Sequence, residues 1–273
     1  MTQRSYYPGV KVFFIFIGLY LLVPPYGALP CTLFGAIGDS VDGGGVLIGK
    51  TRDRPNKLEQ AFIEVSPSAG FRYRGIAAMG TKTVTSGINE KGVVVVNAMA
   101  SSLGKEDKIT SVGRILSRVS AVDEVVALVK KGEVHGPVFY LAGDSHQLAL
   151  IEVIDGRRHA IQVKKDGILY HTNHFVLKDM EKLNQKIGTS SQARLNRIGK
   201  LLSDGSVTKD KFITFVQDHY NGPGNNSICR HFEAEVRSSE QTVSAAVYYL
   251  PKAALPEIWV SLGQLCQSVF ERK

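Results

Sequence analysis

Strand-length apolar segments joined by tight turns constrain this 273-residue chain more than any other feature of its sequence. Residues 31–37 and 46–50 flank an Asp-Gly-Gly-Gly turn, and residues 83–88 and 92–98 flank the turn Asn-Glu-Lys. Turn residues of this kind between apolar runs are typical of β-hairpins. The pattern therefore predicts antiparallel sheets.

Helical periodicity occurs only in separate blocks, at residues 122–130, about 191–202 and about 209–219. Further strand-like segments lie at 61–65, 71–76, 137–141, 148–154, 158–163, 167–171, 243–250 and 257–262. Regular alternation of strand, helix and strand is absent from this series. We therefore expect an α+β fold, and one domain is the default for a body of this length.

The first thirty residues have the features of a secretory signal. Arg4 and Lys11 precede the apolar run 12–23, which Pro24 and Pro25 end. A basic start, a short apolar stretch and a small-residue exit are typical of such a signal, and a membrane-spanning helix needs about 20 apolar residues. We expect 1–30 to be removed and 31–273 to form the mature domain in a periplasmic, secreted or luminal location. An uncleaved membrane anchor is the alternative.

The charge distribution argues against a nucleic-acid partner. The formal net charge is +8, but the basic residues are scattered and no run is long enough for a nucleic-acid-binding tail. The excess predicts only a mild attraction for anionic partners.

Three cysteines, Cys31, Cys229 and Cys266, follow the leader. An odd number in an oxidising compartment leaves at least one thiol free. Cys229 and Cys266 are able to pair, but the sequence does not establish that they do. Cys229 is a rival nucleophile in principle, and we expect it to be buried or disulfide-bonded.

Cys31 stands immediately behind the predicted leader. As the first residue of a mature chain it would have its own α-amine as the base that the thiol needs, because the pKa of such an amine lies near 7.7–8.0. This arrangement requires removal of everything before Cys31. The alternative is a small buried hydrophobic residue, the usual fate of a lone cysteine.

A series of short motifs strengthens the catalytic interpretation. In chain order they are Cys31-Thr32, Gly49-Lys50-Thr51-Arg52-Asp53, Gly87-Ile88-Asn89-Glu90-Lys91-Gly92, His171-Thr172-Asn173-His174-Phe175, Ser190-Ser191-Gln192-Ala193-Arg194 and Ser227-Ile228-Cys229-Arg230-His231. The series resembles the choloylglycine hydrolase and penicillin V acylase superfamily, and most of all its acyl-coenzyme A:6-aminopenicillanic acid acyltransferase branch of linear amide C–N hydrolases. The resemblance extends from Cys31 to about Cys266. It implies a four-layer α/β/β/α sandwich of the N-terminal nucleophile hydrolase type.

The resemblance also implies roles around the nucleophile Cys31. Asp53 would accept a hydrogen bond from the Cys31 α-amine. Lys50 or Arg52 would favour the thiolate as a nearby cation. Thr51 replaces the asparagine usual at that position, and an arginine often stands where this chain has Lys50, so the choice between the two cations stays open. The alternative for this group is a solvated charge cluster beside a turn.

Two asparagines and an arginine complete the implied site. Asn173 would donate to the oxyanion, and Asn97 is the candidate second donor, although the bile-salt branch has its asparagine at the position of Met99. Arg194 would steady the site, with an exposed helix arginine as its alternative. No cofactor and no metal is expected: His171 and His174 have the spacing H-x-x-H, but no third ligand lies at motif spacing.

The expected activity is hydrolysis of a carbon–nitrogen amide bond in a small-molecule acyl amide, through an acyl-enzyme at Cys31. The alternatives are transfer of the acyl group to an amine acceptor, and an inactive exported binding protein on the same scaffold. Signal peptidase or the chain itself would perform the maturation. The sequence leaves open the substrate and the oligomeric state, a homo-oligomer included.

Overall fold

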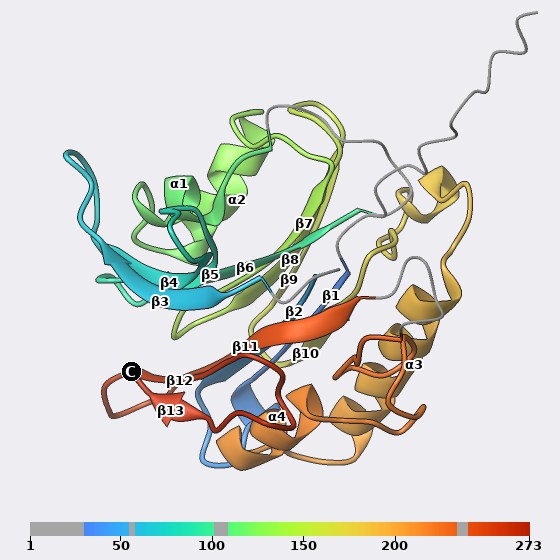
Figure 1. Cartoon of the computed structure of the whole chain (residues 1–273). Coiled ribbons are helices and arrows are strands. Elements are labelled where there is room, and N and C mark those ends of the chain that lie inside the picture. The colour runs from blue at the N-terminus through green and yellow to red at the C-terminus, as the bar shows by residue number, and fades with distance from the viewer. Residues whose placement is uncertain (1–29, 55–57, 101–108, 234–239) are drawn as a thin grey trace, which may run out of the picture.

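The computed structural model describes residues 30–54, 58–100, 109–233 and 240–273. Two antiparallel sheets pack face to face, and helices cover both outer faces (Figure 1). Of the predicted leader, residues 1–30, only Pro30 belongs to the described residues. Within the described residues, no helix has the length and apolar character that crossing a membrane requires.

The first sheet has six strands in the order β10-β1-β2-β11-β12-β13. Their bounds are β1 Cys31–Ile37, β2 Val46–Arg54, β10 Gly167–His171, β11 Gln241–Leu250, β12 Glu257–Leu262 and β13 Glu271–Arg272. β1 and β2 form the predicted hairpin, in which Cys31 is paired with Arg52. Gly43, Gly44 and Gly45 all have positive φ in its turn, a conformation that suits glycine.

The second sheet has seven strands in the order β3-β4-β5-β6-β7-β8-β9, so each strand pairs with its neighbour in sequence. Their bounds are β3 Gln60–Val65, β4 Tyr73–Ala78, β5 Val84–Asn89, β6 Val94–Met99, β7 Val138–Gly143, β8 Leu148–Val153 and β9 His159–Lys164. The turn after Asn89 joins β5 to β6 as predicted.

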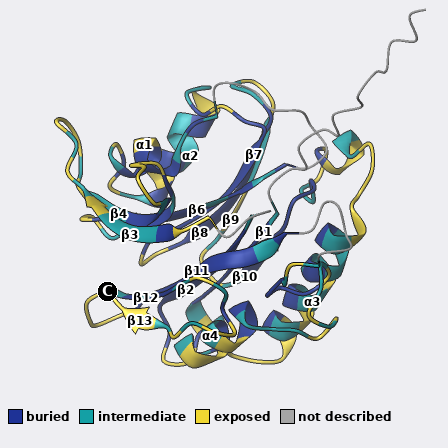
Figure 2. Cartoon of the chain, in the orientation of Figure 1, coloured by how far each residue is buried: buried dark blue, intermediate teal, exposed yellow. Residues whose placement is uncertain are grey.

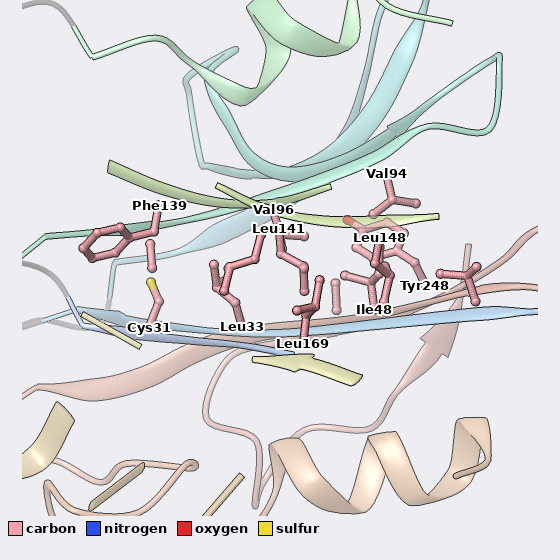
Figure 3. Close-up of a cluster of buried hydrophobic side chains, with 14 of the residues drawn as sticks. Cys31, Leu33, Ile48, Val94, Val96, Phe139, Leu141, Leu148, Leu169 and Tyr248 are labelled. Atoms are coloured by element: carbon pink, nitrogen blue, oxygen red, sulfur yellow. The ribbon is translucent and has the colours of Figure 1, made fainter. Parts of the chain in front are cut away.

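Three apolar clusters hold the layers together. One fills the space between the sheets (Figure 3) and includes Cys31, Leu33, Ile48 and Phe139. The second lies under α1 (Val112–Leu116) and α2 (Val122–Lys130), and the third lies under α3 (Thr189–Ser203) and α4 (Lys209–Val216). Figure 2 shows both sheets buried along their inner strands. The predicted α+β sandwich with four layers is confirmed.

The helix expected at about 209–219 ends earlier, at Val216. Beyond this point the chain turns, and the carboxylate of Asp218 accepts a 2.6 Å hydrogen bond from Arg197 of α3. This ion pair fastens the segment after α4 against α3.

Candidate active site

Cys31 begins β1 and is 3% exposed. Residues directly opposite in an antiparallel pair point to the same face of the sheet, so Cys31 and its partner Arg52 both face the space between the sheets. Figure 3 shows the Cys31 side chain pointing across this space toward Phe139 of the other sheet. The thiol thus lies between the sheets at the end of a central strand.

The backbone nitrogen of Cys31 is held by a network on the helical side of the sheet. It donates a 3.1 Å hydrogen bond to Asn173 Oδ1, just after β10. Arg194 of α3 donates from Nη2 to the same oxygen at 2.8 Å, and from Nη1 to the Cys31 carbonyl at 2.7 Å. Thr32 Oγ1 accepts a further 2.9 Å bond from Arg194 Nη1. The Arg194 guanidinium therefore holds the Cys31 carbonyl directly and the Cys31 nitrogen through Asn173 Oδ1.

Arg194 is 1% exposed, so the alternative of an exposed helix arginine is wrong. Burial lowers its pKa to about 10, which leaves it charged at neutral pH. The Ser190 hydroxyl, one turn earlier on α3, accepts a 3.3 Å hydrogen bond from Arg194 Nε. This bond helps to hold the guanidinium in the site.

Successive side chains of β2 point to opposite faces of the first sheet, so the strand contributes to the site on both faces. Lys50 and Arg52 point toward the second sheet: Lys50 Nζ donates to the Thr85 carbonyl at 2.7 Å, and Arg52 Nη1 donates to Thr85 Oγ1 at 3.1 Å. Asp53 points the other way, and its Oδ1 accepts from Thr242 Oγ1 at 2.8 Å. All three are buried, which excludes a solvated charge cluster. Both cations therefore share the face of the thiol, and the carboxylate lies on the opposite face.

Of the two cations, Lys50 has the pKa closer to neutrality. Burial lowers the pKa of Lys50 to about 7, and negative charge at Cys31 acts in the opposite direction as the next largest influence. Burial lowers the pKa of Arg52 only to about 10. The charge of Lys50 therefore changes within the working pH range, whereas that of Arg52 does not.

Exchanging Lys50 for arginine should move the alkaline limb of the pH–rate profile to higher pH. The wild-type ammonium is lost as pH rises through about 7, and the thiolate then loses a stabilising cation. A guanidinium stays charged across this range. The profile of Lys50→Arg, measured beside the surface control Lys131→Arg, checks this. An alkaline limb at the wild-type position in Lys50→Arg would show that Lys50 does not support the thiolate.

Asp53 adjoins the bond that joins Pro30 to Cys31. Its backbone nitrogen donates to the Pro30 carbonyl at 3.2 Å. Its Oδ2 is buried and accepts no hydrogen bond from the residues that the structure describes, while Arg230 Nη1 lies 3.5 Å away. Asp53 therefore holds the backbone just before Cys31, and one of its carboxylate oxygens has only Arg230 as an ion-pair partner among the described residues.

Arg230 is a site residue to which the sequence interpretation gave no role. It is 3% exposed, and its Nη1 donates to Glu240 Oε2 at 2.9 Å in addition to the ion pair with Asp53. Its backbone nitrogen donates to Thr242 Oγ1 at 2.9 Å, the hydroxyl that bonds Asp53. The motif that ends in Arg230-His231 was the available signal, but it does not reveal a partner more than 170 residues earlier in the chain.

The two asparagines proposed as oxyanion donors lie in different parts of the site. Asn173 Nδ2 donates to the Met99 carbonyl at 2.9 Å. Asn97 lies on β6 and accepts from Lys50 Nζ at 3.0 Å. Asn97 and Met99 share one face of β6. Asn97 contacts Lys50, whereas the Met99 side chain packs against the cluster under α1 and α2 and only its carbonyl bonds Asn173.

His171 and His174 have separate partners. His171 Nε2 lies 2.7 Å from Glu152 Oε1, and both side chains are fully buried between the sheets. His174 Nδ1 lies 2.7 Å from Ser191 Oγ, and burial lowers its pKa to about 4. These two histidines thus connect layers of the fold.

The fold and this site define the class of protein: two antiparallel sheets between helices, with a cysteine at the start of a central strand, are the architecture of the N-terminal nucleophile hydrolases. The model of the family called acyl-coenzyme A:6-aminopenicillanic acid acyl-transferase matches residues 41–264, most of the chain. The chain belongs to this family. It is an enzyme of the amide C–N hydrolase type. Cys31 precedes the matched stretch.

Solved structures show the same fold at low sequence identity. Penicillin V acylase from Agrobacterium tumefaciens is 15% identical with a TM-score of 0.52, over 85% of this chain and 83% of that one. A variant of conjugated bile acid hydrolase from Clostridium perfringens is 12% identical with a TM-score of 0.55, over 88% and 92%. An N-acylethanolamine-hydrolyzing acid amidase ortholog from Caenorhabditis elegans is 13% identical with a TM-score of 0.51, over 81% and 93%. No curated protein matches the sequence.

Proposed function

We propose that the mature chain begins at Cys31 and hydrolyses the carbon–nitrogen bond of a small acyl amide through a thioester at this residue. The observation that carries the proposal is the environment of the Cys31 backbone nitrogen. This atom bonds Asn173 and lies beside Asp53, whose Oδ2 is without a hydrogen bond from the described residues. A freed ammonium group would keep Asn173 Oδ1 as one acceptor, and we assign the Asp53 carboxylate as the second.

The reaction follows from this geometry. The α-amine takes the thiol proton, and the sulfur attacks the amide carbon to give a tetrahedral oxyanion. The α-ammonium then protonates the leaving nitrogen, the carbon–nitrogen bond breaks, and the thioester forms. Water attacks the thioester with the amine as base, which releases the carboxylic acid and restores the thiol. Lys50 and Arg52 stabilise negative charge on the thiol side, and Arg194 keeps Cys31 in place.

Substrate would reach the site from the strand ends that carry Asp53 and Arg54. Gln241, the partner of Arg54 on β11, helps to line a cavity of about 600 Å³ at this edge. Its apolar lining comes from Leu58, Met79, Phe232, Val243 and Leu262, and its polar lining includes His231 and Gln264. Cys31 does not line it. The size and character suit the acyl portion of a small ligand. Penicillins, conjugated bile acids and N-acylethanolamines, named by the structural neighbours, are the first compounds to test.

Maturation is part of the proposal, since a chain that retains Pro30 has an amide and no amine at Cys31. Signal-directed export followed by a cut before Cys31, or trimming of Leu29 and Pro30, supplies the free terminus. N-terminal sequencing and intact mass of the protein from its host should give Cys31 as the first residue. A stable, active chain that begins at Leu29, or one that keeps the leader as an anchor, would contradict the mechanism.

Transfer of the acyl group to an amine is the second candidate, and the name of the matching family favours it. The two reactions share the thioester and differ only in what attacks it. Adding an amine acceptor to a working hydrolysis assay and measuring the ratio of amide to acid separates them. A family member without activity on any acyl amide would instead be an exported binding protein.

A further inference from the structure

Four metal-ligating side chains that the mechanism at Cys31 does not use converge beside the first sheet, and one of them, His231, also lines the cavity proposed for the acyl group. They are His219 after α4, Cys229 and His231 on either side of Arg230, and Cys266 in the turn after β12. Their potential ligand atoms all lie within 4.8 Å of one another. Three separate segments of the chain thus place two thiols and two imidazoles in one cluster. We propose that this cluster is a zinc site.

Four of the six distances between the ligand atoms lie near the edges of a tetrahedron around zinc, and the two from Cys229 Sγ to the histidines are within 4.8 Å. Zinc–sulfur and zinc–nitrogen bonds of 2.3 and 2.0–2.1 Å give tetrahedron edges of about 3.8 Å between sulfurs, about 3.6 Å between sulfur and nitrogen, and about 3.3 Å between nitrogens. Cys229 Sγ and Cys266 Sγ lie 3.8 Å apart. Cys266 Sγ lies 3.1 Å from His219 Nε2 and 3.5 Å from His231 Nε2. The two Nε2 atoms lie 2.7 Å apart, so the rings separate by about half an ångström on binding.

The donor set selects zinc among common metals. Two thiolates and two imidazoles in a tetrahedral arrangement are the ligands of structural zinc sites, whereas calcium and magnesium require oxygen ligands. Two thiolates also neutralise the charge of the ion, which suits a site with one fully buried ligand, Cys229. Four protein ligands leave no open position for substrate, so the site is structural.

Surrounding hydrogen bonds fix the ligands independently of a metal. Cys229 N donates to the Asp218 carbonyl at 3.1 Å, and His231 N donates to the Pro223 carbonyl at 2.8 Å. Gln264 Oε1 accepts from Cys266 N at 2.9 Å, and its Nε2 donates to the Arg230 carbonyl at 3.0 Å. The backbone at Cys229, His231 and Cys266 is therefore held in place without a metal. Zinc binding would require little rearrangement of the chain there.

The position of Arg230 between two ligands connects this site to the catalytic residues. Cys229 and His231 hold the segment from which Arg230 reaches Asp53. Zinc would therefore act as a positioning element for the Asp53 carboxylate. The proposal does not depend on which reaction Cys31 performs, because metal content is measured without substrate.

The test is the zinc content of the full-length protein, purified without a metal-affinity tag and with zinc in the growth medium. Inductively coupled plasma mass spectrometry should find about one zinc per chain, and substituted Co²⁺ should give the absorption of tetrahedral cobalt with thiolate ligands. Cys266→Ser and His219→Ala should each lose most of the zinc. Cys31→Ser and His146→Ala, the same changes outside the cluster, should retain it.

Thermal unfolding supplies a second readout for variants that fold poorly. A chelator should lower the unfolding midpoint of the wild-type protein and leave that of Cys266→Ser unchanged. The proposal is overturned by zinc-free protein with three free thiols after growth in zinc. It is also overturned by a stoichiometric Cys229–Cys266 disulfide in the mass spectrum, or by iron or copper bound in place of zinc.

Discussion

Cys31→Ala should lower kcat for amide hydrolysis by about 10⁶-fold, the loss typical of removing a catalytic nucleophile. The substitution deletes only the sulfur from a side chain that is 3% exposed, so the variant should keep the wild-type circular dichroism spectrum. The wild-type protein is mixed with substrate, the reaction is quenched, and the protein is digested. Mass spectrometry should then find the acyl group on the peptide that begins at Cys31. The alanine variant should carry none.

Two further variants test whether this loss of activity is specific to the thiol of Cys31. Ile37→Val, at the other end of β1, should keep near-normal activity, which would exclude a general effect of altering the strand. Cys31→Ser should retain only a trace, because a hydroxyl ionises less easily than a thiol. If Cys31→Ala hydrolyses amides at the wild-type rate, the nucleophile lies elsewhere. The mechanism proposed for Cys31 would then be wrong, although the protein would still be an amide hydrolase.

Asp53→Asn should lower kcat by about 10²–10⁴-fold, the range of a contribution to positioned proton transfer. The amide keeps the shape of the side chain, but the negative charge beside the α-amine is lost. The ammonium form is then less favoured, so the pKa of the amine falls. The acid limb of the pH–rate profile should consequently move to lower pH while the rate at the optimum decreases.

Asp144→Asn is the matched control for this prediction. Asp144 is also buried and accepts backbone hydrogen bonds from Val122 and His146, at 2.8 and 2.9 Å, but it lies in the turn between β7 and β8. This variant should lose stability and keep a normal specific activity and pH profile. If Asp53→Asn behaves in the same way, with a lower thermal midpoint and unchanged kinetics, the role of Asp53 in β2 is structural only.

Local sequence patterns predicted the fold well where neighbouring segments pair. The β1–β2 and β5–β6 hairpins are encoded by their turn residues, and α2 by the periodicity of its valines. α1 was not predicted, because five residues are too few for a helical period to appear. Its formation depends on packing against β5 and β6 and on the cap that Ser111 provides.

The motifs identified candidate site residues, but not how they face one another. The expected strand ended at Lys50, so strand alternation could not be applied to Arg52 and Asp53; β2 in fact continues to Arg54, held by its pairing with β1 and β11. The contact between Arg230 and Asp53 and the cluster around Cys229 join residues far apart in the chain. Local patterns contain no signal for such contacts.

The alternation along β2 also limits which insertions and deletions this protein tolerates during evolution. Adding or deleting one residue between Gly49 and Asp53 would exchange the two faces, so that the carboxylate pointed at the thiol and a cation at the amine. The turn between β1 and β2 is free of this restriction, because a change of length there leaves the pairing of Cys31 with Arg52 intact. Functional relatives should therefore differ in the length of that turn and keep the spacing from Lys50 to Asp53 without exception.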